Sequence, residues 1–502
     1  MAQVISVQLQ LQLTHAPVSI VRAPAGMLAV RESRLKLGRW IGWRAAATTF
    51  PQVDPETRHV FKEYTAMSQE EVRSAVDGAN EAFLCWRRAP TVERVQTIGK
   101  LAELLRGRAD EAAELMRREM GKPLPQGKAE VLKCAYLVDW YAQHGAAFLQ
   151  DSECPPLPGF QRSFVTYKPL GVILSIMPWN YPFWQVIRMS VPTLMAGNAV
   201  VLKHAPNCFG SALLCEELFG MLSSAGLPEG LFRSLLIDVP QVEAVLEDPL
   251  VQGVAFTGSE RGGRAVATRA GSLLKKAVVE LGGSDAYAVL ADADLDGAAE
   301  AVVNARVANS GQACISPKRA IVEKSVRADF ERLILEKVAQ KSYGVDFGPM
   351  VHSQAREQVA AQVLASQKAG AELLFGGVEV PAPETCAAGG AFMAPTVLTG
   401  VKPGMAAFDE EIFGPVIAII EAEDEAEVVE LANRSHYGLG GAIFTTDRAK
   451  GERIAADEID AGMCFVNDFV RSDPSLPFGG VKASGLGREC AAFGLMEFVN
   501  VK

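Results

Sequence analysis

The sequence is poor in the patterns that hold metal ions or disulfide bonds. Its 502 residues include six histidines and nine cysteines, but no two histidines are spaced as H-x-x-x-H and no two cysteines as C-x-x-C. The histidines therefore indicate no metal site. An odd number of scattered cysteines favours a reducing compartment over a disulfide framework or a zinc site.

The body of the chain also lacks an apolar run that could cross a membrane. Its longest uncharged stretch is residues 169–187, which Pro178, Asn180 and Pro182 interrupt. Because a spanning helix needs about 20 consecutive apolar residues and proline breaks a helix interior, we expect no transmembrane helix. Apolar residues make up 49% of the sequence and charged residues 22%, which is typical of a globular protein. The length allows about three domains.

Positive charge is scarce outside the N-terminal segment. The formal net charge of −10 argues against a nucleic-acid partner. Residues 1–49 carry six basic residues and one acidic residue, so their net charge is +5 and the remainder has −15. An Arg-rich, acid-poor start is typical of a transit peptide, which would place the protein in a mitochondrion or plastid. A disordered tail or a wrongly chosen start codon is the alternative, and the cytoplasm is then expected.

A helical region precedes an alternation of strands and helices. Apolar side chains recur at helical spacing along residues 70–140, as on one face of an amphipathic helix; the first such stripe is Val72, Ala75, Val76, Ala79 and Phe83. Short apolar runs then alternate with helical stretches, and the predicted strands are 172–177, 199–203, 232–237, 251–256, 276–280, 287–290 and 320–322. This alternation predicts an α/β fold with a parallel sheet covered by helices on both faces.

Two residues on glycine-flanked loops suggest the chemistry. Cys314 ends the uncharged sequence NSGQAC, and Glu280 lies 34 positions earlier, just before two glycines. A thiol nucleophile and a carboxylate base are the groups needed for covalent catalysis at a carbonyl carbon. An isolated cysteine is more often a buried structural residue, so the prediction depends on the motifs around it.

Those motifs form an ordered set of seven. They are PWNYP at 178–182, AGNAVVLK at 196–203, AFTGS at 255–259, VVELGGS at 278–284, NSGQAC at 309–314, EEIFGPV at 410–416 and PFGGVKASG at 477–485. In order and in spacing between glutamate and cysteine, the sequence resembles the aldehyde dehydrogenase superfamily from about Phe50 to the C-terminus. One such motif would be weak, whereas seven in order are specific.

The resemblance implies an aldehyde dehydrogenase-like α/β fold with three parts. A Rossmann-type parallel-sheet domain for the dinucleotide is expected at 50–150 and 172–281, an α/β catalytic domain at 282–470, and a small β oligomerisation element at 151–171 and 471–502. A homodimer or homotetramer is expected. The chain ends at Lys502, about where the last intersubunit strand of the family begins, which leaves the oligomeric state open.

The resemblance also implies a reaction. Cys314 would attack the aldehyde, Asn180 and the Cys314 backbone N–H would stabilise the oxyanion, and Glu280 would activate the water that releases the acid. The residues expected to bind NAD or NADP are Trp179, Lys203, Gly258, Ser259, Gly263, Leu281, Glu411 and Phe413. Members that prefer NAD tend to carry a glutamate three residues after the lysine. Pro206 occupies that position here, so a barrier to the 2′-phosphate of NADP is absent.

Arg188 is the candidate for substrate recognition. In succinate-semialdehyde dehydrogenases an arginine at this place binds the distal carboxylate of the substrate, which suits a planar guanidinium; an ion-paired structural arginine is the alternative. A second arginine of those enzymes is replaced here by Ala308, and Arg471 or Ser472 could supply the missing contact. The strings MPWNYPFWQV at 177–186 and LKHAPN at 202–207 resemble the NAD(P)-accepting succinate-semialdehyde dehydrogenase branch. The alternatives are a broad-specificity aldehyde dehydrogenase and an inactive nucleotide-binding structural relative.

Overall fold

The computed structural model describes residues 48–388 and 390–502, which fall within one unit, 43–502. Nearly all of the predicted transit segment, 1–49, lies outside the described residues. Within the described ranges, no helix combines the length and the apolar character needed to span a membrane.

A strand pair and a layer of helices precede the first large sheet. Strands β1 (Thr49–Val53) and β2 (Val60–Thr65) are antiparallel. The helices that follow are α1 (Gln69–Trp86), α2 (Thr91–Gly99), α3 (Leu101–Gly107), α4 (Ala109–Met120) and α5 (Leu124–Phe148). Helix α1 begins with a capping box, in which the Ser68 hydroxyl accepts from the Glu71 N–H and the Glu71 carboxylate accepts from the Ser68 N–H. Its buried face contains the apolar stripe predicted from the sequence.

The predicted parallel sheet has six strands in the order β18-β10-β9-β6-β7-β8. They are β6 (Val172–Met177), β7 (Ala199–His204), β8 (Phe232–Ser234), β9 (Val251–Thr257), β10 (Lys276–Glu280) and β18 (Gly485–Leu486). Only β18 runs antiparallel to its neighbour. Every residue of β6 and β7 is buried, as expected for parallel strands covered on both faces. The edge strand β8 is shorter than the predicted 232–237.

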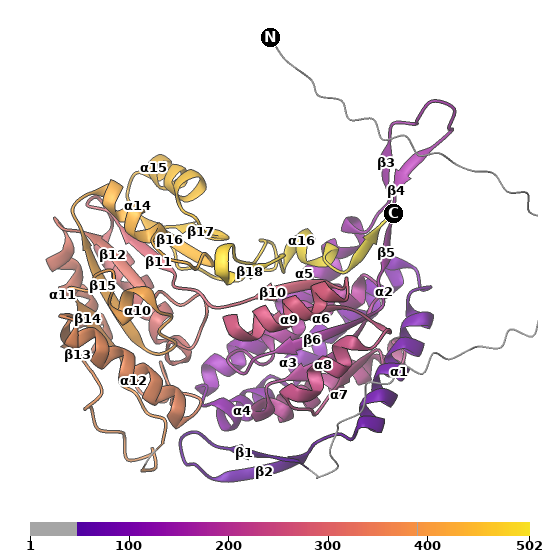
Figure 1. Ribbon diagram of the computed structural model, residues 1–502, viewed down its shortest axis with the longest axis horizontal. Helices are drawn as coiled ribbons and strands as arrows, with labels where there is room; N and C mark the ends of the chain where they lie inside the picture. The colour runs from indigo at the N-terminus through magenta and orange to yellow at the C-terminus, as the bar shows by residue number, and fades with distance from the viewer. Residues whose placement is uncertain (1–47, 389) are drawn as a thin grey trace, which may run out of the picture. The chain divides into compact units, whose positions relative to one another are not determined.

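The crossover segments bring four strand ends to one edge of this sheet. The crossover segments are α6 (Trp184–Met195), η1 (Pro206–Cys208), α7 (Phe209–Gly220), η2 (Met221–Ala225), α8 (Val239–Glu247) and α9 (Glu260–Ser272). Several of them surround the strands in Figure 1. Met177 pairs with His204 and Glu280 pairs with Thr257. The carboxyl ends of β6, β7, β9 and β10 therefore meet, and this is where ligands bind in open α/β sheets.

A second sheet has seven strands in the order β13-β14-β15-β12-β11-β16-β17, and only the β13–β14 pair is antiparallel. The strands are β11 (Ala286–Val289), β12 (Arg319–Glu323), β13 (Glu372–Phe375), β14 (Thr396–Thr399), β15 (Val416–Ala422), β16 (Gly440–Phe444) and β17 (Met463–Val466). The helices are α10 (Leu295–Val307), η3 (Ala308–Gly311), α11 (Arg327–Val338), α12 (Ser353–Lys368), α13 (Ala406–Asp409), α14 (Glu425–Asn433), α15 (Arg448–Arg453) and the π-helix η4 (Ile454–Glu458). Alternate residues of β11 enter two different apolar clusters, so both faces are covered.

The remaining strands form two small antiparallel pairs. β3 (Ser152–Cys154) pairs with β4 (Ser163–Val165), and β5 (Tyr167–Pro169) pairs with β19 (Val499–Val501). The β3–β4 hairpin projects from the two large sheets (Figure 1). The C-terminal segment also contains η5 (Lys482–Ser484) and α16 (Ala491–Met496). Before it reaches β19, this segment supplies β18 to the six-stranded sheet beside β10.

Arg319 makes the second sheet sensitive to a single substitution. Its buried guanidinium donates to the carbonyl oxygens of Ser284, Leu431 and Ala432 at 2.7–3.1 Å. We expect Arg319→Met to lower the free energy of unfolding by about 3–5 kcal/mol, because three buried carbonyls lose their donor. Urea unfolding measures the loss.

The matched control is Arg332→Met. Arg332 lies on the surface of α11, where it pairs with Glu336 at 2.9 Å and its side chain is 56% exposed. Removing it is expected to change the free energy of unfolding by less than about 1 kcal/mol. Equal losses in the two variants would contradict a structural role for the buried guanidinium.

Candidate active site

The ends of the parallel strands bring together most of the predicted cofactor residues. Trp179 follows β6, Lys203 is the penultimate residue of β7, and Gly258 follows β9. Ser259 caps α9, since its hydroxyl accepts from the Gly262 N–H at 3.3 Å. Helix α9 therefore begins at this edge, and a helix N-terminus there favours a bound phosphate group.

Two polar groups at this edge lack partners within the described part of the chain. The ammonium of the buried Lys203 makes no hydrogen bond or ion pair, and burial lowers its pKa. The hydroxyl of Thr257 is likewise buried without a partner. An unsatisfied buried polar group is costly, so this edge suits a ligand rich in hydroxyl and phosphate oxygens, such as a dinucleotide.

The other predicted cofactor residues lie in two contacts near the same edge. Gly263 packs so closely on Leu281 that a Cβ at Gly263 would overlap the leucine side chain. The rings of Trp179 and Phe413 meet edge to face, with centroids 5.8 Å apart. The packing of α9 on the chain that follows β10 thus requires glycine at 263. The two aromatic rings connect the end of β6 with the segment that precedes β15 in the second sheet.

Cys314 lies in an irregular loop with an unusual backbone. Asn309, Ser310 and Gly311 are consecutive and have φ of +51°, +55° and +69°, although only glycine adopts this region freely. A Cβ at Gly311 would overlap the carbonyl oxygen of Gly414. Left-handed residues in succession are held only where the surroundings over-determine them.

Hydrogen bonds to distant segments hold this loop. The Ser310 hydroxyl donates to the Gly348 carbonyl at 2.8 Å, and the Gln312 side-chain oxygen accepts from the Val351 N–H at 2.9 Å. The Asn309 N–H donates to the side chain of Gln126 on α5 at 2.8 Å. The loop is therefore fixed by contacts with both large parts of the described chain.

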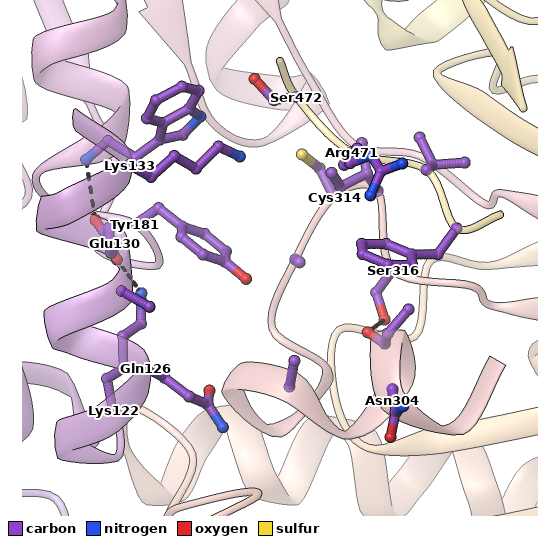
Figure 2. A pocket seen from close by; sticks show the side chains of 18 of the residues that line it. Lys122, Gln126, Glu130, Lys133, Tyr181, Asn304, Cys314, Ser316, Arg471 and Ser472 are labelled. Atoms are coloured by element: carbon purple, nitrogen blue, oxygen red, sulfur yellow. Dashed lines mark hydrogen bonds and ion pairs between the residues drawn. The ribbon is translucent and has the colours of Figure 1, made fainter. Parts of the chain in front are cut away.

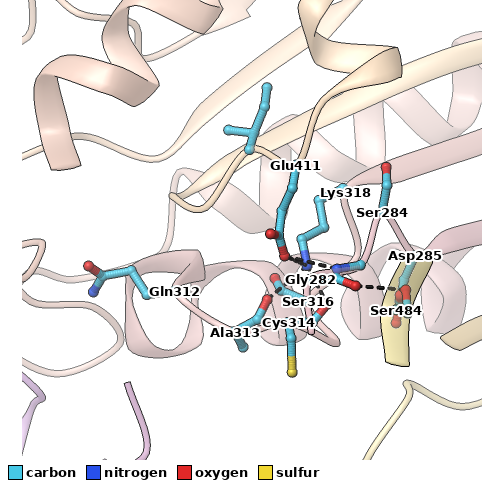
Figure 3. Close-up of polar contacts among 12 residues, drawn as sticks. Gly282, Ser284, Asp285, Gln312, Ala313, Cys314, Ser316, Lys318, Glu411 and Ser484 are labelled. Carbon is cyan, nitrogen blue, oxygen red and sulfur yellow. Dashed lines mark hydrogen bonds and ion pairs between the residues drawn. The ribbon is translucent and has the colours of Figure 1, made fainter. Parts of the chain in front are cut away.

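A buried lysine binds the backbone at Cys314. The Lys318 ammonium donates to the carbonyls of Ala313 and Cys314 and lies 3.6 Å from the Glu411 carboxylate. Glu411, a predicted cofactor residue, also accepts from the Gly283 N–H at 3.0 Å. Figure 3 shows these contacts on one side of the loop and the Cys314 side chain pointing to the other.

The electrostatics of Cys314 favour the neutral thiol. Burial raises the pKa of Cys314 to about 12, and the positive charges of Lys318 and Arg188 oppose that rise. The thiol therefore needs to lose its proton to a base as it attacks, because the thiolate is the nucleophile.

Asn180 is joined to the cysteine loop. Its side-chain amide donates to the Gln312 carbonyl at 3.0 Å, and its own carbonyl accepts from Asn309 at 2.9 Å and from the buried Lys122 at 2.8 Å. One amide hydrogen of Asn180 and the backbone N–H of Cys314 make no hydrogen bond to any other described residue. Both are the donors predicted for an oxyanion.

Glu280 lies at the end of β10 and is almost fully buried, with 2% of its surface exposed. One carboxylate oxygen has no hydrogen-bond partner in the described part of the chain. Burial raises its pKa well above the usual value for glutamate, and the negative charge of Glu489 raises the pKa further. Arg188 opposes both effects. A carboxyl group with a raised pKa suits proton transfer near neutral pH.

Cys314 opens into a pocket of about 540 Å³ that contains all three predicted substrate residues, Arg188, Arg471 and Ser472. Figure 2 shows Arg471 and Ser472 beside Cys314 and the α5 side chains on the opposite wall. Arg471 is half-exposed and ion-paired with Asp468. The hydroxyl of Ser472 lies 3.9 Å from the Cys490 sulfur.

Arg188 is already engaged by the protein. Its buried guanidinium pairs with Glu489 and stacks on Phe478, with the Arg188 carbon 4.2 Å from the ring centroid. Arg188 lies on α6, which begins at Trp184, and Asn180 precedes that helix. Arg188 is thus ion-paired, as the alternative expected, and it also lines the pocket, as a substrate-binding residue must.

Several residues of the site carry no motif and were not found from the sequence. Glu130 on α5 accepts from the Phe183 and Trp184 N–H groups at 2.9 Å and pairs with Lys122, so it positions the start of α6. Glu489 likewise belongs to none of the seven motifs. All nine cysteines are free thiols, and the described residues contain no group of three or more side chains that could hold a metal ion.

Comparisons with known proteins agree with this geometry. The profile described as the aldehyde dehydrogenase family matches residues 43–502. The NAD(P)+ succinate semialdehyde dehydrogenase Sad of Escherichia coli is 40% identical over 462 residues, which cover 91% of this chain and 97% of that protein. The NADP+ succinate-semialdehyde dehydrogenase of Deinococcus radiodurans is 40% identical over 459 residues, with coverages of 90% and 94%.

Among solved structures, the succinic semialdehyde dehydrogenase of Streptococcus pyogenes in complex with NADP+ has the same fold. It superposes with a TM-score of 0.85 at 35% identity, over 90% of this chain and 98% of that one. The predicted α/β fold class, with Rossmann-like parallel sheets and helices, is confirmed.

Proposed function

Because this chain belongs to the aldehyde dehydrogenase family, we propose that it oxidises succinate semialdehyde to succinate with NAD(P)+. The observation that carries the proposal is the pocket at Cys314, whose wall also contains the buried guanidinium of Arg188, a group suited to bind the distal carboxylate of a short aldehyde. The relatives that are 40% identical and act on succinate semialdehyde support this choice.

The reaction begins at the cysteine sulfur. The Cys314 thiol gives its proton to the Glu280 carboxylate, which passes it to solvent, and the sulfur bonds to the aldehyde carbon. The oxygen that becomes negative accepts hydrogen bonds from the Asn180 amide and the Cys314 backbone N–H. The aldehyde carbon would lose its hydride to NAD(P)+, and this hydride acceptor is what the cofactor would supply. The acyl group is then held as a thioester on Cys314. Glu280 removes a proton from water, the water oxygen bonds to the acyl carbon, and the sulfur leaves as the acid is released.

The cofactor would lie along the carboxyl edge of the six-stranded sheet. Lys203 would bind the adenosine ribose, Gly258 and Ser259 the pyrophosphate, and Glu411 the nicotinamide ribose. Glu411 is held by Lys318 and by the Gly283 N–H, which supports a fixed position for its carboxylate. Pro206 places no negative charge beside Lys203, and this supports use of NADP as well as NAD.

We also propose a homodimer or a homotetramer. The β3–β4 hairpin exposes apolar side chains, and Leu157 and Phe160 are 62% and 66% exposed. Exposed apolar groups on a projecting hairpin favour burial against another subunit. The strand pair β5–β19 offers an additional sheet edge beside it.

The substrate proposal is tested with aldehydes matched in length. Wild-type kcat/KM for succinate semialdehyde should exceed that for butanal by roughly 30- to 150-fold, because a charge-assisted contact to the carboxylate is worth about 2–3 kcal/mol. Cys314→Ala should abolish both activities while circular dichroism shows a folded protein. Equal efficiency on the two aldehydes would instead indicate a broad-specificity aldehyde dehydrogenase.

The cofactor proposal is tested at Pro206. We expect wild-type protein to use NADP with useful efficiency and Pro206→Glu to shift the ratio of kcat/KM toward NAD by at least about tenfold, because a carboxylate repels the 2′-phosphate. Steady-state rates at saturating aldehyde measure the ratio. A wild-type enzyme without NADP activity would contradict the proposal.

The pH dependence of turnover tests the role of Glu280. A general base must be ionised, so kcat rises with pH through the pKa of Glu280. Glu489→Gln removes a negative charge that raises this pKa and leaves Arg188 less neutralised, and both changes lower it. The acidic limb of kcat should therefore move to lower pH, by about one unit. An unchanged limb, or a shift to higher pH, would exclude Glu280 as the group observed.

A further inference from the structure

The substrate pocket contains five cationic side chains, four of which have partners. Lys122 pairs with Glu130, Arg188 with Glu489, Arg471 with Asp468, and Lys341 lies 3.5 Å from Asp346 and 2.7 Å from the Asn304 oxygen. The fifth is Lys133. Its ammonium makes no hydrogen bond or ion pair with any residue that the structure describes. It makes a cation–π contact with the Trp184 ring, 4.2 Å from the centroid.

Lys133 is well placed to meet a ligand in the pocket. It lies on α5, and its partly buried side chain extends from that helix into the open centre of the pocket, with Cys314 on the opposite wall (Figure 2). Ala308, which stands where the second arginine is found in succinate-semialdehyde dehydrogenases, also lines the pocket. The pocket therefore lacks a cationic side chain at position 308 but has an unpaired one, Lys133, on α5.

The charge balance around Lys133 points to an anion. Arg188 lies close enough for its positive charge to disfavour a second one on Lys133, and only the Arg188 charge has a carboxylate partner. Two like charges in a partly desolvated pocket repel each other, and an anion bound between them removes the penalty. The half-exposed Arg471, neutralised by Asp468, is a weaker candidate for this role.

We propose that Lys133 binds the distal carboxylate of the aldehyde substrate, together with Arg188, and so determines specificity for an aldehyde acid. This inference rests on the proposed function. In this arrangement Glu489 holds one side of the guanidinium, the other side faces the substrate, and the Lys133 ammonium approaches the carboxylate from α5. A point charge without a fixed fork tolerates small differences in the length of the substrate.

The protonation of Lys133 provides a signature. Burial lowers its pKa to about 8, and the charge of Arg188 on α6 contributes to the decrease; Cys490 before α16 and Cys134 and Glu130 on α5 act in the opposite direction. The ammonium is charged below this pKa and is lost above it. KM for succinate semialdehyde should therefore rise as the pH increases through about 8, whereas KM for butanal should not follow this change.

The first test is Lys133→Met. It should lower kcat/KM for succinate semialdehyde roughly 10- to 100-fold, mainly through KM, because a charge-assisted contact of about 1.4–2.8 kcal/mol is lost. Its effect on butanal should be at most about threefold. Succinate should also become a weaker competitive inhibitor of butanal oxidation. The matched control is Lys128→Met on the same helix, since Lys128 is 48% exposed, pairs with Asp110 at 2.7 Å and lies outside the pocket.

The second test is Lys133→Arg, which keeps its charge at alkaline pH. It should retain most of the efficiency on succinate semialdehyde and abolish the rise of KM above pH 8. The inference is wrong if Lys133→Met weakens both aldehydes equally, or if Lys133→Arg leaves the pH profile of KM unchanged. A wild-type enzyme that does not prefer succinate semialdehyde over butanal would instead refute the proposed function.

Discussion

The geometry around Cys314 depends on buried cations that bind main-chain carbonyl groups. Lys318 binds the carbonyls of Ala313 and Cys314, Lys122 binds that of Asn180, and Arg306 binds those of Ile412 and Val416 at 2.6–2.7 Å. The irregular backbone at Asn180 and Cys314 leaves carbonyls without a helical or sheet partner, and buried side chains satisfy them. Each such contact costs the desolvation of a charge, which the carbonyl dipoles and nearby carboxylates offset.

The two halves of the site solve different problems. The edge of the six-stranded sheet offers uncharged groups, helix α9 and one unpaired lysine, which suit a large polar ligand. The pocket beyond Cys314 concentrates charge, with cations on α5 and α6 and carboxylates that compensate most of them. Glu489 belongs to both arrangements, since it neutralises Arg188 and raises the pKa of Glu280. The proposed substrate recognition by Arg188 and the proposed base strength of Glu280 are therefore coupled through one buried carboxylate.

Much of this organisation could be predicted from the sequence. Strand β6 covers the residues 172–177 that the apolar run predicted, and the stripe from Val72 to Phe83 is the buried face of α1. Ordered motifs identified the family, because they mark strand ends and loops whose residues lie close together. The pairing of Arg188 with Glu489 spans 301 positions, and Lys133 is 181 positions from Cys314. The Arg188–Glu489 contact, and the placement of Lys133 and Cys314 in one pocket, follow from tertiary packing, which local spacing does not encode.

The short strand β18 gives the order of synthesis a role in assembling the site. Until residues 485–486 have emerged from the ribosome, β10 is an unpaired edge strand, and its last residue is Glu280. The chain that leads to β18 is separated from β10 by the whole seven-stranded sheet. Contacts so distant along the chain form late and leave an exposed edge meanwhile. A nascent chain can thus complete its six-stranded sheet only after the seven-stranded sheet has been translated, so Glu280, the proposed base, is enclosed only once β18 is available.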